Sequence, residues 1–383
     1  MKIVYCTPSL YIAGGVERVL TTKANYLAEQ PEKYDVTVIL TDGKGKPPFY
    51  PLSEKVKVIN LDIGFEELWQ LSFVQKIPVY LHKQRLFRQR LTETLMQLQP
   101  DITVSTLRRE INFITAIGDG SRKIGEMHIN RQNYRNFANE TSPIKRLFAK
   151  WWMWRLTGKL RRLDKFVVLT AEDMAAWSEL DNVCVIPNPL LATAAVRSTL
   201  TEKRVVAVGR YSHEKGIDLL LQAWSRVEKA CPDWRLDVFG AGDTAPYETL
   251  ADELRLDKER YALNGPTKDV PAEYAASSIF ALSSRFEGFG MVIIEAMAAG
   301  LPVASFNCPY GPQNLISDGV NGLLAENGNP QALADAIIRL INDAQLRRSL
   351  AAKAVEDAKE YSIEKIGKRW EELFAEVTKK RLA

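Results

Sequence analysis

The stretch SIFALSSRFEGFGMVIIEAMAAGLPVASF, residues 278–306, contains one complete strand–helix–strand pattern. Its two short apolar runs, residues 278–284 and 301–306, have the length of buried strands. The run between them has the length and composition of a helix, and it ends at Gly300, a residue type that commonly follows helix C-termini. Such a unit is typical of α/β proteins, in which helices cover both faces of a parallel sheet.

The same alternation runs through the whole chain. Helix-sized segments separate most of the short apolar runs, so we predict two doubly wound α/β domains. In such domains ligands bind beyond the carboxyl ends of the strands, and two facing domains would enclose a cleft. The further expected strands are residues 2–9, 35–43, 101–106, 165–170 and 183–189 in the first half, and 204–210, 235–240 and 261–265 in the second.

The boundary between the domains is expected near IPNPLLATAAVRSTLTEK, residues 186–203. Two prolines end the preceding strand there, and a polar stretch leads to the next one. We therefore predict an N-terminal domain over residues 1–187 and a C-terminal domain over residues 188–361. An amphipathic helix over about 362–383, with Ser362 as its N-cap, is expected to pack back on the first domain.

Composition narrows the classes of function. The net charge of +4 over 383 residues is too small to favour a nucleic-acid partner. There is no C-x-x-C pair, no signal-peptide layout and no apolar run of about 18 residues, so we expect a cytoplasmic protein without a disulfide framework, zinc cluster or spanning helix. The four scattered cysteines are Cys6, Cys184, Cys231 and Cys308.

Two cations follow the strand expected at residues 204–210. Arg210 ends it and Lys215 lies in the loop beyond, while Gly209 lets the chain turn sharply. Two cations at one strand end can hold a diphosphate through charge-assisted hydrogen bonds. The alternative is a pair of solvated surface cations.

Two glutamates follow the strand expected at residues 278–284. Glu287 lies in the loop, and Glu295 lies about one and a half turns inside the helix. Carboxylates can accept hydrogen bonds from paired sugar hydroxyls, and the amides at the helix start can bind phosphate oxygens. The alternative is that Glu287 interacts with the helix dipole and Glu295 forms a buried ion pair. The residues expected to bind a ligand at the helix start are Phe289, Gly290, Met291 and Val292.

The first half offers fewer candidates. Gly14 and Gly15 form a turn before a helix that begins near Val16, where backbone amides can approach a ligand closely. The alternative is an ordinary tight turn. His128 lies beside an expected strand end, although a lone histidine is more often structural than catalytic. No G-x-G-x-x-G follows a strand, which argues against a dehydrogenase.

Five ordered segments resemble the retaining glycosyltransferases of family 4, which have the GT-B fold of two facing Rossmann-like domains with an interdomain cleft. The resemblance covers nearly the whole chain, and its most specific part is the two-glutamate segment with its Gly-Phe-Gly loop. The five segments are GGVERVL, VIPNP, VGRYSHEKGIDLLLQAW, SSRFEGFGMVIIEAMAAGLPV and CPYGPQNLISDGVNGLL.

The resemblance implies roles for the matching residues. Arg210 and Lys215 would hold the donor diphosphate, Glu295 would bind the ribose, and Glu287 would bind the donor sugar near the reacting carbon. His128 would contact the donor sugar from the N-terminal domain. Gly14 and Gly15 would approach the phosphates and the acceptor. By the same resemblance, the N-terminal domain would bind the acceptor and the C-terminal domain would bind the nucleotide sugar. The family uses no metal, and this chain contains no Asp-x-Asp motif. No cofactor is expected, because the nucleotide sugar is a substrate.

The implied activity is transfer of a hexose or N-acetylhexosamine from a nucleotide diphosphate sugar to a hydroxyl of a glycan or lipid-linked glycan, in surface polysaccharide biosynthesis. The resemblance favours UDP, and no residue excludes GDP or ADP. Two alternatives remain at this point: a nucleotide-sugar epimerase of the same fold, and a non-catalytic nucleotide-sugar binding module.

A basic, tryptophan-rich stretch covers residues 143–165, PIKRLFAKWWMWRLTGKLRRLDK. Basic residues mixed with tryptophan are typical of helices that lie on anionic membrane surfaces. The alternative is a surface helix whose tryptophans pack into the N-terminal domain. The membrane interpretation would place the protein peripherally at the inner membrane face.

Overall fold

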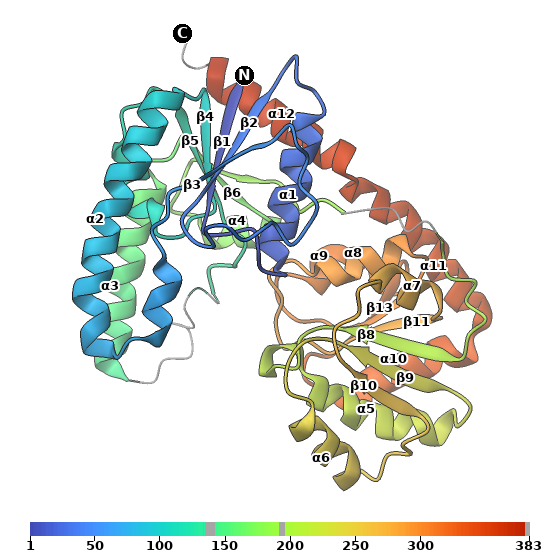
Figure 1. Cartoon of the computed structure of the whole chain (residues 1–383). Helices are drawn as coiled ribbons and strands as arrows, with labels where there is room; N and C mark the ends of the chain where they lie inside the picture. The colour runs from blue at the N-terminus through green and yellow to red at the C-terminus, as the bar shows by residue number, and fades with distance from the viewer. Residues whose placement is uncertain (133, 135–141, 191–195, 380–383) are drawn as a thin grey trace. The chain divides into compact units, whose positions relative to one another are not determined.

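The computed structural model describes residues 1–132, 134, 142–190 and 196–379. The chain forms two compact units, which are described separately (Figure 1). Unit 1 contains Met1–Pro189 and Ile363–Ala383, and unit 2 contains Leu190–Ser362. The first part of unit 1 ends at Pro189, whereas the predicted N-terminal domain ends at residue 187. The last helix belongs to unit 1.

Unit 1 is built on a seven-stranded parallel sheet in the order β3-β2-β1-β4-β5-β6-β7. The order reverses between β1 and β4, so a crevice for ligands is expected at the carboxyl ends of these two strands. The strands are β1 (Lys2–Thr7), β2 (Asp35–Leu40), β3 (Lys57–Asn60), β4 (Ile102–Ser105), β5 (Arg122–Glu126), β6 (Lys165–Val168) and β7 (Val183–Val185).

All five strands listed for this half are present. Strand β3 was not anticipated, and β5 was anticipated only as the strand end before His128. Strand β5 contains three charged residues in five, a composition that does not predict a buried strand. Two of these charged residues, Lys123 and Glu126, are nevertheless buried, because each finds a partner. Lys123 Nζ lies 2.5 Å from Asp119 Oδ1, and Glu126 pairs with Lys23 of helix α1.

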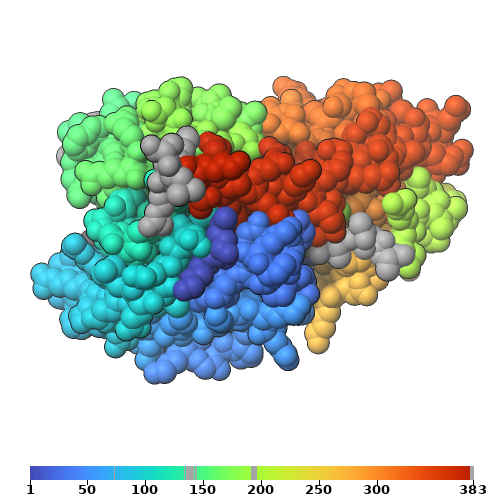
Figure 2. All heavy atoms as spheres, turned by 90° about the horizontal axis from the view of Figure 1, so that it is seen from above, coloured from blue at the N-terminus to red at the C-terminus, as the bar shows by residue number. Residues whose placement is uncertain are grey.

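The main helices of unit 1 are α1 (Gly15–Ala28), α2 (Phe73–Leu98), α3 (Pro143–Leu160), α4 (Ala171–Ala176) and α12 (Ile363–Lys379). Helix α12 buries Trp370 and Phe374 in the same apolar cluster as Leu20 and Leu27 of α1. Glu371 on α12 also accepts a hydrogen bond from the Tyr26 hydroxyl at 2.9 Å. Figure 2 shows this last helix, in red, beside the blue N-terminal segments of unit 1.

Unit 2 contains a six-stranded parallel sheet in the order β10-β9-β8-β11-β12-β13, which reverses between β8 and β11. All five strands predicted here are present, and the short strand β13 was missed. The strands are β8 (Arg204–Val208), β9 (Arg235–Phe239), β10 (Tyr261–Asn264), β11 (Ile279–Leu282), β12 (Val303–Phe306) and β13 (Gly322–Ala325). The helices are α5 (Ile217–Ala230), α6 (Ala245–Glu253), α7 (Val270–Ala275), α8 (Met291–Ala298), α9 (Pro312–Leu315), α10 (Pro330–Asn342) and α11 (Ala344–Ala358).

Gly300 ends helix α8 as predicted. Its φ is +83°, and its N–H donates to the carbonyl of Met297 while the N–H of Leu301 donates to that of Ala296. This pattern is a Schellman motif, which requires a left-handed residue and therefore favours glycine.

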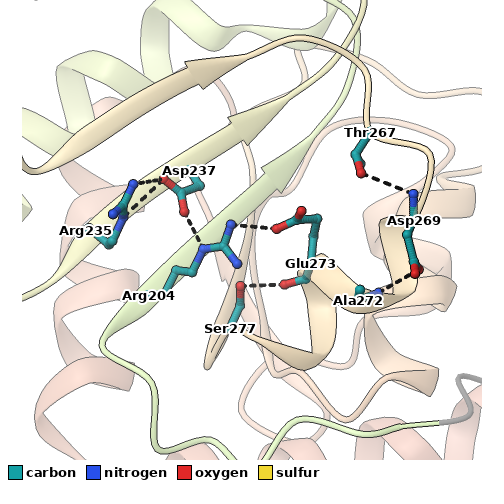
Figure 3. A network of polar contacts seen from close by, with 8 residues as sticks. All are labelled: Arg204, Arg235, Asp237, Thr267, Asp269, Ala272, Glu273 and Ser277. Carbon is teal, nitrogen blue, oxygen red and sulfur yellow. Dashed lines mark hydrogen bonds and ion pairs between the residues drawn. The ribbon is translucent and has the colours of Figure 1, made fainter.

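Figure 3 shows a polar network in unit 2 that includes Arg204 and Arg235, the first residues of β8 and β9. Arg204, the first residue of β8, pairs with Asp237 of β9, and its Nη2 lies 2.7 Å from Glu273 Oε2 of α7. Asp269 caps α7 by accepting from the amide of Ala272 at 3.0 Å. These contacts join β8, β9 and α7, so they explain stability rather than ligand binding.

Candidate functional site

An ion pair occupies the switch point of the unit 2 sheet. Lys215 comes from the loop after β8 and Glu287 from the loop after β11, and the Lys215 Nζ lies 2.6 Å from the Glu287 Oε1. The side chain of Glu287 is 8% exposed and that of Lys215 is 20% exposed. The structure thus brings together two residues that the sequence placed at neighbouring strand ends, 72 positions apart.

Glu287 is fixed from two further sides. The Ser284 hydroxyl donates to Glu287 Oε1 at 2.6 Å. Gly311 packs against the base of the same side chain, because a Cβ at this position would lie 2.6 Å from the Cβ of Glu287. Any larger residue at 311 would therefore displace the carboxylate.

Arg285 holds the two loops together. Its guanidinium donates two hydrogen bonds to the Asp218 carboxylate, at 2.9 and 2.6 Å, and a third to the carbonyl of His213 at 2.7 Å. Burial alone would raise the pKa of Asp218, but hydrogen bonds from Arg285 hold it below its usual range. The loop of Lys215 is therefore preorganised before any ligand binds.

The close approach of these loops also depends on Gly216. Its φ is +61°, and a Cβ there would lie 2.1 Å from the carbonyl oxygen of Ser283. The Ser283 hydroxyl in turn donates to the carbonyl of Lys215 at 2.9 Å.

Arg210 has a different environment from Lys215. Its side chain is 70% exposed and lies 3.5 Å from Glu214, at the i,i+4 spacing. A weak exposed pair of this kind leaves the guanidinium free to exchange its partner for a ligand oxygen at small cost.

Helix α8 begins at Met291, directly after the loop that carries Glu287. Gly290 is its N-cap with a φ of +90°, and a glycine offers no side chain to cap the first amides. Phe289 is buried, whereas Val292 and Glu295 are partly exposed on the first two turns. The donor-binding residues predicted from Phe289 to Glu295 therefore lie on one loop and one helix start, directly after Glu287 in the chain.

In unit 1, Gly15 begins α1 and Gly14 is its N-cap, with an ordinary extended backbone at φ −118°. A Cβ at Gly15 would meet no atom within 4 Å. Packing in this structure therefore gives no reason for a glycine at position 15. The loop borders a cavity of about 180 Å³ lined in part by Thr7, Ser9 and Val16.

His128 follows β5 and rests on a buried charged pair. The ammonium of Lys23 and the carboxylate of Glu126 are each 2% exposed, and His128 Nε2 lies 3.5 Å from Glu126 Oε1. Burial would raise the pKa of Glu126, but Lys23 and His128 together lower it to about 2. Lys23 also lies 4.2 Å from the ring centre of Trp370 in α12. The imidazole therefore lies beside a buried charged pair in the core of unit 1.

Sequence reasoning missed three residues that build the site: Ser284, Arg285 and Gly311. The serines that end β11 were a usable signal, since polar residues at the end of a buried strand often face a ligand site. The roles of Arg285 and Gly311 depend on contacts with distant residues and had no local signal.

Comparison with known proteins places the chain in a family. Residues 193–357 match the model of "Glycosyl transferases group 1". The chain is 30% identical over 375 residues to an uncharacterized glycosyltransferase of Haemophilus influenzae, covering 96% of this chain and 98% of that protein. It belongs to the glycosyl transferases group 1 family. It is therefore a glycosyltransferase, and the predicted enzyme class is confirmed.

Other relatives extend this result. An "Exopolysaccharide phosphotransferase SCO2592" of Streptomyces coelicolor is 34% identical over 395 residues, which is 96% of this chain and 40% of that protein. A Staphylococcus aureus TarM mutant, solved with Fondaparinux, alpha-GlcNAc-glycerol and UDP, aligns with a TM-score of 0.73 at 17% identity and covers 97% of this chain and 99% of that one. The predicted GT-B fold is confirmed by this structural similarity together with the two parallel sheets.

Proposed function

We propose that the protein moves a hexose or N-acetylhexosamine from a UDP-sugar to a sugar hydroxyl of a glycan in surface polysaccharide biosynthesis, with retention of anomeric configuration. The observation that carries the proposal is the contact between Lys215 and Glu287 at the switch point of unit 2, beside the start of α8. A cation, a carboxylate and the amides at a helix start are the groups that bind a sugar diphosphate.

The proposed chemistry follows from these groups. The bond between the anomeric carbon and the diphosphate oxygen breaks, and its electron pair stays on the phosphate. Lys215, Arg210 and the first amides of α8 stabilise the charge that develops there. Glu287 accepts hydrogen bonds from sugar hydroxyls and favours positive charge at the anomeric carbon. The acceptor hydroxyl attacks on the face that the diphosphate leaves, and its proton passes to a phosphate oxygen.

The polymeric acceptor is supported by the relatives. The S. coelicolor relative is named for exopolysaccharide, and the TarM structure holds UDP together with glycan ligands. An epimerase would consume its nucleotide sugar without an acceptor, and a binding module would release no nucleotide. We expect UDP release only when both donor and acceptor are present, and loss of that release in Glu287→Ala.

The donor can be identified without knowing the acceptor. A ligand that binds only the folded protein raises its melting temperature, so the full chain is heated with UDP-, GDP- and ADP-linked sugars in parallel. The proposal predicts the largest rise with a UDP-sugar. Equal rises with all three, or none, would contradict the UDP assignment.

Contact with a membrane surface forms part of the proposal and concerns α3. No helix in the described part of the chain is long and apolar enough to cross a bilayer. Helix α3, however, exposes four large apolar side chains among its cations: Leu147, Phe148, Trp151 and Trp154. The spacing of these four residues places them on neighbouring turns, as in helices that lie in the membrane interface.

The membrane contact is tested by sedimentation with vesicles that contain anionic lipid. We expect binding at low salt that weakens as salt is added, and loss of binding in Trp154→Ser. Trp154 is 72% exposed, so the fold should tolerate this change. Absence of vesicle binding at low salt would refute the membrane contact and leave the transferase proposal untouched.

A further inference from the structure

A second cavity lies in unit 1, in addition to the one of about 180 Å³ beside the Gly14–Gly15 loop. Its volume is about 620 Å³, and it is bounded by α2, by α3 and by the loops that follow β4 and β5 (Figure 1). The loop after β4 starts beside the switch point between β1 and β4, where a doubly wound sheet binds its ligands.

The charged residues in the described lining of this cavity are all positive. Four cations line it: Arg108 and Arg109 from the loop after β4, and Arg155 and Lys159 from α3. No aspartate or glutamate lies among the described residues of its lining. Like charges gathered in one concavity repel each other, and a bound anion would relieve that repulsion.

Two of these cations lie over aromatic rings. The Arg109 guanidinium lies 4.2 Å from the ring centre of Phe65, and that of Arg155 lies 4.9 Å from the ring centre of Trp151. Burial lowers the pKa of Arg109, although nearby acids such as Asp42 oppose this. Stacking fixes the direction of each guanidinium while leaving its N–H groups available to a ligand.

The acid nearest in sequence is turned away from the cavity. Glu110 is buried, and its carboxylate accepts hydrogen bonds from the Ser105 hydroxyl at 2.8 Å and from the amide of Arg108 at 3.2 Å. It therefore orders the loop that presents Arg108 and Arg109.

The rest of the lining suits a saccharide. Tyr80, Tyr134 and Trp152 line the cavity, and aromatic rings pack against the apolar faces of sugar rings. Asn112 also lines it, and its Oδ1 accepts from Lys159 Nζ at 2.6 Å. The surface thus combines flat apolar contacts with a concentration of positive charge.

The cavity shares two residues with the smaller cavity beside the glycine loop. Arg108 and Arg109 line both this cavity and the smaller one of about 180 Å³, which includes Val16 at the start of α1 and three acids, Glu17, Asp42 and Glu66. A ligand held at the two arginines therefore lies beside the cavity that borders the Gly14–Gly15 loop.

We propose that this cavity, defined by Arg108, Arg109, Arg155 and Lys159, binds the phosphate group of a phosphate-bearing glycan acceptor and directs the acceptor end toward the Gly14–Gly15 loop. The inference rests on the proposed function, since it identifies the class of acceptor. Phosphate oxygens accept paired hydrogen bonds from guanidinium groups, which explains three arginines in one lining.

Binding is measured by calorimetric titration of the full chain with three probes at equal ionic strength: a glycerol phosphate oligomer, farnesyl diphosphate and the neutral glycan maltohexaose. We expect binding of a phosphate probe that is at least tenfold tighter than binding of maltohexaose. Tighter binding of the oligomer would identify a phosphodiester glycan, and tighter binding of farnesyl diphosphate would identify the diphosphate of a lipid-linked glycan.

Arg155→Ala should weaken phosphate-probe binding at least tenfold and leave UDP affinity unchanged. Arg146→Ala is the matched control, because Arg146 is exposed on the same helix and lines neither cavity. Equal losses in the two variants, no phosphate-probe binding, or equal affinity for maltohexaose would overturn the proposal. If the transferase assignment is wrong but this proposal is right, UDP will not bind, and Arg155→Ala will still weaken the binding of the phosphate probes.

Discussion

Replacing Lys215 by alanine tests the ion pair at the centre of the site. The change removes the charged partner of Glu287, whose side chain is 8% exposed, and leaves the hydrogen bond from Ser284 in place. Breaking a buried pair from one side costs about 3–5 kcal/mol. Lys215 is 20% exposed, so we expect the lower end, about 3 kcal/mol. That loss corresponds to a fall of roughly 6–12 °C in the melting temperature of a unit of this size.

Glu287→Gln should cost less than Lys215→Ala. The amide can still accept from Ser284, and the ammonium of Lys215 can turn to water, so the expected loss is about 1 kcal/mol. The double variant should be more stable than Lys215→Ala alone, because it no longer buries an uncompensated charge. Differential scanning calorimetry of the full chain measures all three variants.

The control is Lys203→Ala, which removes the same side chain from an exposed pair with Asp233 in the same unit. Exposed pairs contribute about 0–1 kcal/mol, so this variant should melt close to the wild type. Two results would contradict a buried ion pair at the site. One is that Lys215→Ala melts no lower than Lys203→Ala. The other is that the losses in unfolding free energy of Lys215→Ala and Glu287→Gln simply add in the double variant.

Three further predictions concern single residues. Gly15→Ala should fold with unchanged stability, because its Cβ meets no atom within 4 Å, but should lower kcat/KM at least tenfold; normal kinetics would show that no ligand approaches this turn. Gly311→Ala should lower both activity and stability, the latter by about 1–3 kcal/mol, because its Cβ would overlap Glu287. Burial raises the pKa of Asp173 to about 6, so the folded state keeps this proton while the unfolded state loses it near pH 4, and the contribution of Asp173 to stability should fall by about 3 kcal/mol between those values. Urea unfolding at pH 4 and pH 7 should show a change in stability that is about 3 kcal/mol less favourable in the wild type than in Asp173→Asn; equal changes in the two proteins would contradict the assignment.

The order of strands and helices was largely readable because apolar runs and helical patterns alternate along the chain. The extent of strand β5 was not predicted, because its buried charges are satisfied by Asp119 and Lys23, which lie outside the strand. Tertiary contacts, and not local composition, therefore make β5 a strand. Strand β13 is no shorter than several strands that were predicted, so its length does not explain why it was missed.

The candidate site could also be predicted only in part from local sequence patterns. The positions of Arg210, Lys215 and Glu287 followed from their place after predicted strands. The direct contact between Lys215 and Glu287 and the clamp of Arg285 on Asp218 join residues far apart in sequence, so no local pattern announces them. The sequence showed that α3 is basic. It did not show that α3 lines a cavity together with the loop after β4, because that contact depends on the fold.

The central claim is that unit 2 grips the diphosphate of a nucleotide sugar, and Arg210 offers the most direct test. Its side chain is 70% exposed with a single weak pair to Glu214, so Arg210→Ala should not disturb the fold. Calorimetric titration compares UDP with uridine, which lacks phosphate, and uses Arg226→Ala on the surface of α5 as the control. We predict that Arg210→Ala weakens UDP binding about tenfold, as expected for one charge-assisted hydrogen bond, and leaves uridine binding unchanged. Wild-type affinity for UDP in Arg210→Ala, or equal weakening of UDP and uridine, would contradict the claim.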